Sequence, residues 1–282
     1  MSAIYKSEAG RQAIQARYRE ILRQWPIPAE QLHVATREGD TFVLASGPQD
    51  APPLVLLHGS GSNSSAWRGD IASWAADFRV YAVDMPGEPG GSAESRPELG
   101  SDAIAAWLDD VLAGLGISAA SFVGMSLGGW TALDYAVRRP ARVTELALYC
   151  PGGIGKQRFG WIFKNLLDHL FSNHDLRRSA AIVTGLNLTD HAEILDDVTL
   201  TFTHFNPRTG KLPIFTDAQL SSLKMPVLVI VGADDAMFKS AETARRAEQL
   251  IPDATIRVLP GVGHAILGQT DSVHEFLRGR HI

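Results

Sequence analysis

A single serine stands between glycines in the segment "SFVGMSLGGWTALDYAV". Gly124, Ser126 and Gly128 fit the pattern G-x-S-x-G, and Gly129 follows directly. An apolar run precedes the serine and a run with helical spacing follows it, so we expect a strand that turns sharply into a helix at Ser126. Glycines on both sides relieve the collisions that larger residues would cause at such a turn. The pattern favours a nucleophilic serine, and the alternative is a glycine-rich turn whose serine has no chemical role.

A second segment offers the hydrogen-bond donors that acyl transfer needs. The apolar run "PLVLLHG" (53–59) leads into "HGSG", and the residue after Gly59 is Ser60. Donors in such a site point at the negative oxygen that develops in the transition state. We predict that the backbone N–H groups of Ser60 and Leu127 form this oxyanion hole, and the N-terminal end of a helix dipole assists the second. His58, directly before the loop, suits a structural hydrogen bond better than the role of base.

A nucleophilic serine requires a base and a carboxylate that orients it. Among nine histidines, His264 lies in the glycine-rich turn "LPGVGHAILGQT", between a predicted strand and the final helix. We expect its imidazole to reach Ser126 as general base. The turn "GADDAMF" offers Asp234 and Asp235, whereas the strand after the serine ends in "YCPGGIG" without a carboxylate. Asp235, the third residue after Gly232, is favoured over Asp234 by its position in this turn. No H-E-x-x-H or other metal spacing connects the histidines, so we expect neither a metal nor a cofactor.

The rest of the chain supplies the elements that must position these residues. Short apolar runs bounded by turn residues alternate with runs of helical spacing. Strands buried on both faces appear as continuous apolar runs, so this alternation predicts a mostly parallel sheet with helices on both sides. Residues 36–47 predict an antiparallel hairpin at the sheet edge. The predicted strands cover residues 53–59, 79–87, 120–126, 142–152, 225–235 and 254–261; the predicted helices cover 101–116, 127–139 and 240–251.

Two further helical regions lie outside this alternation. Residues 7–25 predict an amphipathic helix with a basic outer face, which is expected to pack on the domain surface rather than on a membrane. Residues 153–222 contain helical patterns and no strand of the main sheet, the first of them spanning 159–171. The predicted organisation is an N-terminal helix and the first part of the core (1–152), a helical cap insertion (153–222) and the remainder of the core (223–282).

Composition excludes several classes of function. The 282 residues are 45% apolar and 20% charged, with a formal net charge of −5, which does not favour nucleic acid as a partner. Cys150 is the only cysteine, so no disulfide forms within the chain. No apolar run approaches the ~20 residues of a membrane span, and no secretory pattern follows Met1. We therefore expect a cytoplasmic enzyme; the oligomeric state is not readable from the sequence.

The combined motifs resemble those of the α/β-hydrolase superfamily from about residue 32 onward. The matching segments are "HGSG", "DMPGEPGGS", "GMSLGG", "GADD" and "GVGH", in the order nucleophile, acid, base. The resemblance implies an α/β-hydrolase fold with a helical cap, with Ser126 as nucleophile, Asp235 as acid and His264 as base. Within the superfamily the chain is most similar to bacterial carboxylesterase-type serine hydrolases. The loop containing Glu88 is one residue longer than the usual D-x-P-G-x-G-x-S.

These features predict a cofactor-free hydrolase that cleaves a small to medium apolar carboxylic ester through an acyl-enzyme on Ser126. Alternatives that keep the same triad are a carbon–carbon bond hydrolase of ring-cleavage products, a perhydrolase, and a ligand-binding homologue with low turnover. Residues next to the catalytic motifs are candidates for an apolar substrate pocket: Trp67, Met125, Trp130, Met237, Phe238 and Ile266. Aromatic residues of the insertion are candidates to cover the substrate, although such residues more often pack internally: Trp161, Phe163, Phe202, His204 and Phe205.

Overall fold

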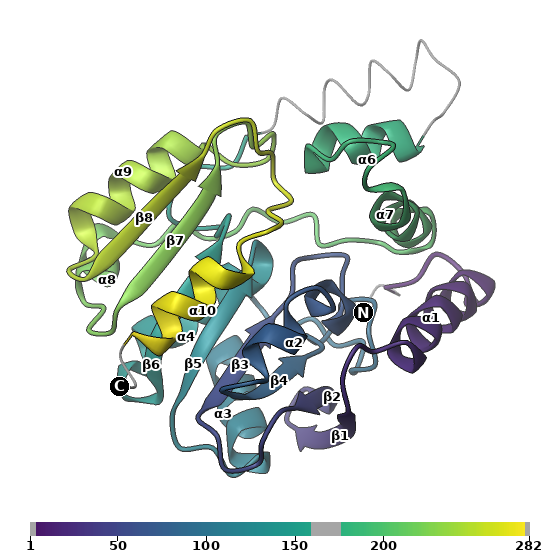
Figure 1. Cartoon of the computed structure of the whole chain (residues 1–282), viewed down its shortest axis with the longest axis horizontal. Helices are drawn as coiled ribbons and strands as arrows, with labels where there is room; N and C mark the ends of the chain where they lie inside the picture. The colour runs from purple at the N-terminus through teal and green to yellow at the C-terminus, as the bar shows by residue number, and fades with distance from the viewer. Residues whose placement is uncertain (1–3, 159–175, 280–282) are drawn as a thin grey trace.

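The computed structural model describes residues 4–158 and 176–279, which contain an eight-stranded sheet flanked by helices (Figure 1). The strands lie in the order β1-β2-β4-β3-β5-β6-β7-β8. β1 and β2 form an antiparallel hairpin, β2 pairs antiparallel with β4, and all other neighbours are parallel. The parallel strands direct their carboxyl ends to one edge of the sheet, where sites of open α/β sheets form. The strands are β1 (Ala29–Thr36), β2 (Gly39–Ser46), β3 (Pro53–Leu57), β4 (Arg79–Val83), β5 (Ala120–Met125), β6 (Val143–Tyr149), β7 (Val227–Gly232) and β8 (Ala254–Leu259).

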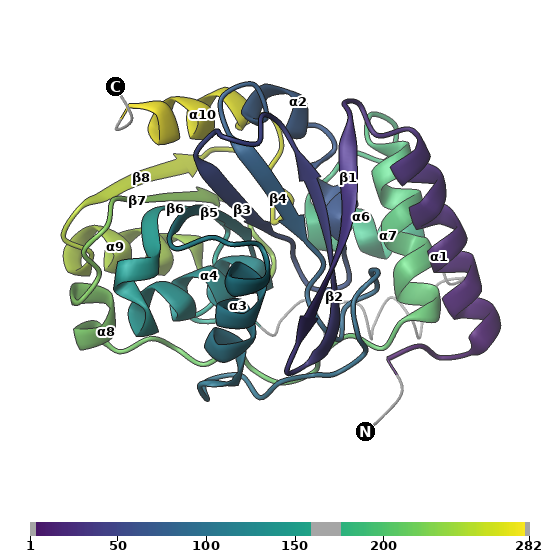
Figure 2. The ribbon, with the colours of Figure 1, turned by 90° about the horizontal axis from the view of Figure 1, so that it is seen from below.

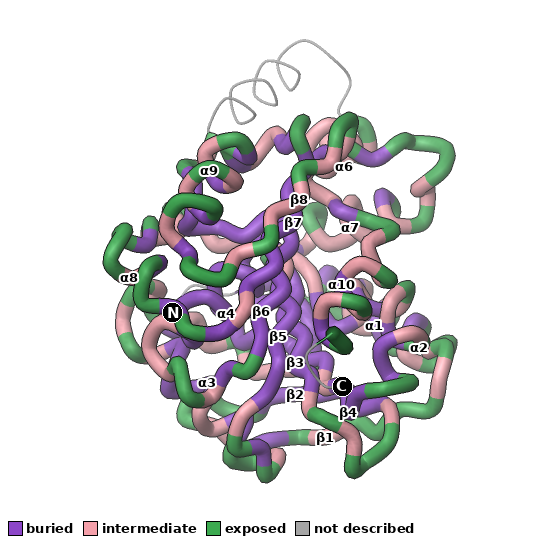
Figure 3. Tube along the Cα trace, turned by 60° about the vertical axis from the view of Figure 1, so that its left-hand side comes forward, coloured by how far each residue is buried: buried purple, intermediate pink, exposed green. Residues whose placement is uncertain are grey.

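The central strands are covered on both faces, as their apolar sequences predict. Every residue of β7 is buried, and so are all residues of β5 except Met125, which is half-buried (Figure 3). β8, at the edge, has only exposed and half-buried residues. The predicted parallel strands are confirmed within a few residues at each end. The predicted hairpin at 36–47 is wrong in extent: residues 39–46 are its second strand only, and the first strand begins at Ala29, where charged and polar residues obscure the pattern.

Helices lie on both faces of the sheet (Figure 2), and each face has its own hydrophobic core. One face is covered by α3, α4 and α9, whose predicted helical runs are confirmed, together with the short α8. The other face is covered by η1, α2 and α10. The bounds are α3 (Ala103–Gly114), α4 (Leu127–Arg138), α8 (Asp217–Ser221), α9 (Ser240–Leu250), η1 (Ser64–Trp67), α2 (Ile71–Trp74) and α10 (Thr270–Arg278); η2 (Pro140–Arg142) precedes β6.

The segment between β6 and β7 leaves the sheet. Its described part contains α6 (Leu176–Thr184) and α7 (Ala192–His204), then α8, and no strand of the sheet lies among these described residues. The helix predicted at 159–171 lies outside the described residues, as do Trp161 and Phe163. In Figure 1, α6 and α7 lie at the same end of the molecule as the carboxyl ends of the strands.

The predicted N-terminal helix is confirmed as α1 (Glu8–Arg23), which Ser7 caps. α1 packs beside α7: the Arg17 guanidinium pairs with Glu193 at 2.7 Å and with Asp197 at 2.6 Å. Ahead of the helix, the Lys6 N–H donates to the His204 carbonyl at 2.8 Å. The N-terminal segment therefore ties α7 to the core. Within the described ranges, no helix is both long and apolar enough to cross a bilayer.

Candidate active site

Ser126 lies at the junction of β5 and α4, in a backbone conformation that few non-glycine residues adopt. Its φ is 53° and its ψ is −108°. A Cβ at Gly128 would lie 2.0 Å from the Leu57 carbonyl oxygen, and one at Gly124 would lie 2.5 Å from the Gly128 carbonyl oxygen. Larger residues at these two positions would therefore collide with the backbone of β3 and α4. The glycines are present because the turn brings three backbone segments into contact, as the pattern predicts.

The structure brings Ser126, His264 and Asp235 into one hydrogen-bonded array. His264 Nε2 lies 3.0 Å from Ser126 Oγ, and His264 Nδ1 lies 2.8 Å from Asp235 Oδ2. A carboxylate oxygen can only accept, so Nδ1 carries the proton and Nε2 accepts from the serine hydroxyl. The adjacent Asp234 is exposed and directs its backbone N–H to the Val262 carbonyl. Of the two candidate carboxylates, the geometry therefore selects Asp235.

The β7–α9 turn fixes the orientation of Asp235. Its side chain is buried, and Oδ1 accepts from the N–H groups of Met237 at 2.6 Å and Phe238 at 3.0 Å. With Oδ1 held by the turn, only Oδ2 is directed to His264. Burial lowers the pKa of His264, but contacts with Cys150 and Asp235 raise it by more, so it lies above its ordinary value. These contacts therefore stabilise the protonated, positively charged form of the imidazole.

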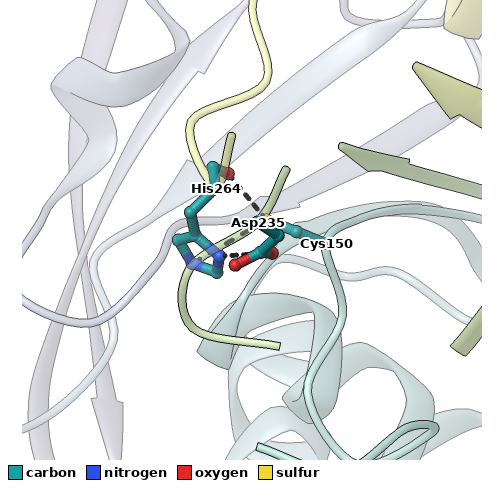
Figure 4. Close-up of side chains that lie close together, drawn as sticks. All are labelled: Cys150, Asp235 and His264. Carbon is teal, nitrogen blue, oxygen red and sulfur yellow. Dashed lines mark hydrogen bonds and ion pairs between the residues drawn. The ribbon is translucent and has the colours of Figure 1, made fainter. Parts of the chain in front are cut away.

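Cys150, which no sequence motif singles out, lies beside this array (Figure 4). Its φ is 37° at the carboxyl end of β6, and its Sγ donates to the His264 carbonyl at 3.1 Å. Candidate ligand atoms of Cys150, Asp235 and His264 lie within 4.8 Å of one another. Both imidazole nitrogens already have partners, namely Ser126 and Asp235. This arrangement suits proton transfer better than coordination of a metal ion.

The loop after β3 lies against the serine. A Cβ at Gly59 would lie 3.6 Å from the Ser126 Cβ, so the loop contacts the turn directly. Within the described ranges, the N–H groups of Ser60 and Leu127 take part in no hydrogen bond. Leu127 is the first residue of α4, where N–H groups have no intrahelical acceptor. Both proposed oxyanion donors are therefore available to a ligand at Ser126.

His58 is a structural residue in this arrangement. It is fully buried, and its Nε2 accepts from the Met85 N–H at 2.9 Å. The proton is therefore on Nδ1, which donates to the Gly59 carbonyl at 2.8 Å. Burial lowers the pKa of His58, which favours this neutral form. His58 thus fastens the loop after β3 to the loop after β4.

Asp84 organises the loop after β4. Its carboxylate accepts from the N–H groups of Ser64 at 2.7 Å and Gly91 at 2.7 Å, and from the Tyr18 hydroxyl at 3.1 Å. The side chain is completely buried. Asp84 is therefore a structural residue that connects α1, η1 and this loop.

The residues predicted to line a substrate pocket divide into two groups. Trp67 is fully buried and packs on Trp74 and Tyr149, while Trp130 stacks on Phe215 in the opposite core. These two tryptophans are core residues in the structure. Ile266 is also buried, in the same core as Trp67. The other three lie close to the array: the Phe238 ring is 5.2 Å from the His264 ring, Met237 supplies an N–H to Asp235, and Met125 directly precedes Ser126.

The aromatic candidates of the insertion also occupy different places. Phe202, on α7, is 42% exposed, and a Cβ at Gly61 would lie 3.0 Å from its ring. Phe205 is fully buried and packs against Tyr5, and His204 lies against Gly10 of α1. Of the described candidates, Phe202 is therefore the one that overhangs the loop after β3.

The chain is similar to known proteins over most of its length. Residues 52–270 match the model of a family described as having the alpha/beta hydrolase fold. The chain is 31% identical to carboxylesterase YbfK of Bacillus subtilis, over 95% of this chain and 93% of that protein. The crystal structure of naproxen esterase (carboxylesterase NP) from Bacillus subtilis superposes with a TM-score of 0.85 at 27% identity, covering 98% of this chain and 100% of that one. A 2-hydroxy-6-oxononadienedioate/2-hydroxy-6-oxononatrienedioate hydrolase of Burkholderia vietnamiensis is 30% identical over 75% of this chain and 80% of its own length.

Proposed function

This chain belongs to the α/β-hydrolase family, and we propose that it is a carboxylesterase whose nucleophile is Ser126. The observation that carries the proposal is the continuous array from Ser126 Oγ through His264 to Asp235, with separations of 3.0 Å and 2.8 Å. The YbfK protein and naproxen esterase, both named as esterases, support the same activity. The proposed substrate is a small to medium apolar carboxylic ester.

The first half of the proposed reaction forms the acyl-enzyme. His264 Nε2 removes the hydroxyl proton as Ser126 Oγ attacks the ester carbonyl. The N–H groups of Ser60 and Leu127 donate to the resulting oxyanion. His264 then gives its proton to the leaving alcohol as the carbon–oxygen bond breaks. Asp235 holds Nδ1 protonated throughout and stabilises the imidazolium.

The second half returns the enzyme to its starting state. His264 removes a proton from water, which attacks the acyl carbon and forms a second oxyanion in the same site. Collapse of this intermediate releases the carboxylic acid and returns the proton to Ser126. The segment between β6 and β7 is proposed to act as the cap, because α6 and α7 flank the site: the Ala265 N–H donates to the Thr184 carbonyl at 2.8 Å, and Phe202 lies against the loop that carries Ser60.

Replacement of Ser126 tests this proposal. Ser126→Ala is expected to lower kcat for p-nitrophenyl esters roughly 10⁴-fold or more while the protein remains folded. Ser222→Ala is a suitable control, because Ser222 is an exposed serine at the end of α8, away from the array. Near-wild-type turnover by Ser126→Ala would contradict the assignment of the nucleophile.

The Burkholderia relative supports one alternative substrate class. A carbon–carbon bond hydrolase would use the same array on a ring-cleavage product. Rates measured with p-nitrophenyl esters of increasing chain length and with a 2-hydroxy-6-oxo dienoate separate the two activities. The carboxylesterase proposal expects the esters to give the higher kcat/KM, and preference for the dienoate would replace it.

A further inference from the structure

Glu88 is a buried carboxyl group that the proposed reaction does not use. It lies in the loop after β4 and is 1% exposed. Its Oε2 accepts from the Gly61 N–H at 2.7 Å and from the Ser60 hydroxyl at 3.3 Å. Its Oε1 has no hydrogen-bond partner within the described ranges, and the nearest cation, the Arg208 guanidinium, lies 3.9 Å away.

This arrangement is unfavourable for an isolated carboxylate. Burial raises the pKa of Glu88 to about 7, although the Gly61 N–H, Arg208, Arg96 and the Ser60 hydroxyl all oppose the shift. A buried carboxyl with one unsatisfied oxygen destabilises a fold, and such groups are concentrated at functional sites. Its two hydrogen-bond donors belong to the loop that supplies one of the proposed oxyanion contacts.

Both Glu88 contacts are made at Ser60 or at the residue directly after it. The Gly61 N–H belongs to the peptide plane that follows Ser60, and the Ser60 hydroxyl is bound by the same carboxyl group. On the other side, Gly59 packs against Ser126. Ser60 is thus held between the serine turn and Glu88. Its N–H lies in the preceding peptide plane, whose carbonyl His58 binds, and the φ and ψ of Ser60 connect that plane to the one that Glu88 holds.

The second proposed oxyanion residue lies close to the same group. Glu88, Arg208 and Leu127 line one small pocket, together with Met85 and Thr131. Glu88 therefore contacts the loop that carries the first donor and shares a pocket with the residue that carries the second.

We propose that Glu88 is a positioning residue of the oxyanion hole, which helps to hold the Ser60 N–H toward the carbonyl oxygen of an ester bound at Ser126. This inference rests on the proposed function. An N–H directed at an oxyanion stabilises the transition state more than the bound substrate. Loss of this orientation therefore lowers kcat and leaves KM almost unchanged.

The test compares Glu88→Ala, Glu88→Gln and the control Glu94→Ala, which removes an exposed carboxylate from the same loop. With a p-nitrophenyl ester, Glu88→Ala is expected to lower kcat about 10- to 100-fold with less than about a threefold change in KM. Glu88→Gln retains an oxygen that accepts from the Gly61 N–H, so its kcat is expected to stay within about fivefold of wild type. Glu94→Ala is expected to match wild type.

A trifluoromethyl ketone provides the readout that a purely structural role would not change. The adduct of the ketone with Ser126 places an oxyanion in the oxyanion hole. The alcohol released from the substrate, p-nitrophenol, inhibits without forming such an oxyanion. Glu88→Ala is expected to weaken inhibition by the ketone by the same factor as kcat and to leave inhibition by the alcohol unchanged. Equal weakening of both inhibitors, or an unchanged kcat, would overturn the inference.

Folding and the proposed function are checked separately. Should Glu88→Ala fail to fold, Glu88→Asp keeps the charge but withdraws the oxygen from Gly61. It is expected to lower kcat more than Glu88→Gln, and the reverse order would overturn the inference. An active wild type with unaffected Glu88 variants refutes only the role of Glu88, whereas a wild type without esterase activity refutes the proposed function.

Discussion

Asp235→Asn changes the proton position on His264 while preserving the turn that holds residue 235. Oδ1 of Asp235 accepts from two backbone N–H groups, those of Met237 and Phe238. An asparagine must keep its oxygen at that position, because its NH₂ group cannot accept these bonds. The NH₂ group then faces His264 Nδ1 at the present distance of about 2.8 Å. Nδ1 must accept, and the proton moves to Nε2, where it prevents removal of the Ser126 proton.

The expected loss follows from this wrong tautomer. We expect kcat for a p-nitrophenyl ester to fall roughly 10³- to 10⁴-fold, which corresponds to about 4 to 5.5 kcal/mol of activation free energy. Since the turn keeps its hydrogen bonds, the melting temperature should change by only a few degrees. Loss of the carboxylate also removes one of the contacts that raise the pKa of His264, so the acid limb of the residual activity should move to lower pH.

Asp234→Asn is the matched control for this variant. Asp234 is the adjacent residue, exposed, and joined to Val262 only through its backbone N–H among the hydrogen bonds of the described chain. Its replacement should leave kcat within about twofold, as is usual for surface substitutions. If Asp235→Asn keeps more than a tenth of wild-type kcat, or if Asp234→Asn loses as much, the tautomer argument is refuted.

Three further predictions concern pH, packing and substrate size. Although burial lowers the pKa of His264, Cys150 and Asp235 hold it above its ordinary value of about 6.5. Because the neutral imidazole is lost as pH falls, kcat/KM should decline toward low pH with a midpoint above 6.5. A flat profile of kcat/KM from pH 5 to 8 would contradict this. Gly128→Ala should lower the free energy of unfolding in urea by about 2–4 kcal/mol, because the added Cβ meets backbone oxygens. Gly69→Ala, whose added Cβ has nothing within 4 Å, should change the free energy of unfolding by less than about 1 kcal/mol. Equal effects of the two substitutions would contradict the close packing at Gly128. Phe202→Ala should raise KM about 3- to 10-fold for long-chain esters and little for acetates, because the exposed Phe202 ring lies over the loop after β3. The same change in KM at every chain length would contradict a role of Phe202 in substrate binding.

Local patterns predicted the turn at Ser126 because its geometry depends on neighbouring residues. Gly124 is required by a contact within one strand–turn–helix unit, which a sequence pattern records directly, whereas Gly128 is required by the close approach of β3. The parallel strands were equally accessible, because burial on both faces leaves continuous apolar runs. The first strand of the hairpin was missed because one face of β1 is exposed and polar.

Residues that act through long-range contacts were harder to predict. Trp67 is adjacent to a catalytic motif in sequence, but η1 turns its side chain into the core. Cys150 and Glu88 reach the site from β6 and from the loop after β4, and no local pattern records those distances. The sequence contained only two indications that these two segments were unusual. The β6 segment ends without a carboxylate, and the loop that contains Glu88 has one extra residue.

Labelling with a fluorophosphonate, followed by mass spectrometric peptide mapping, tests the central claim most directly. An activated serine reacts with this probe, whereas an ordinary surface serine does not. We predict one phosphonyl adduct per chain on the peptide that contains Ser126, no adduct in Ser126→Ala, and loss of ester hydrolysis in step with labelling. An adduct on another residue, or full hydrolysis by the labelled protein, would contradict it.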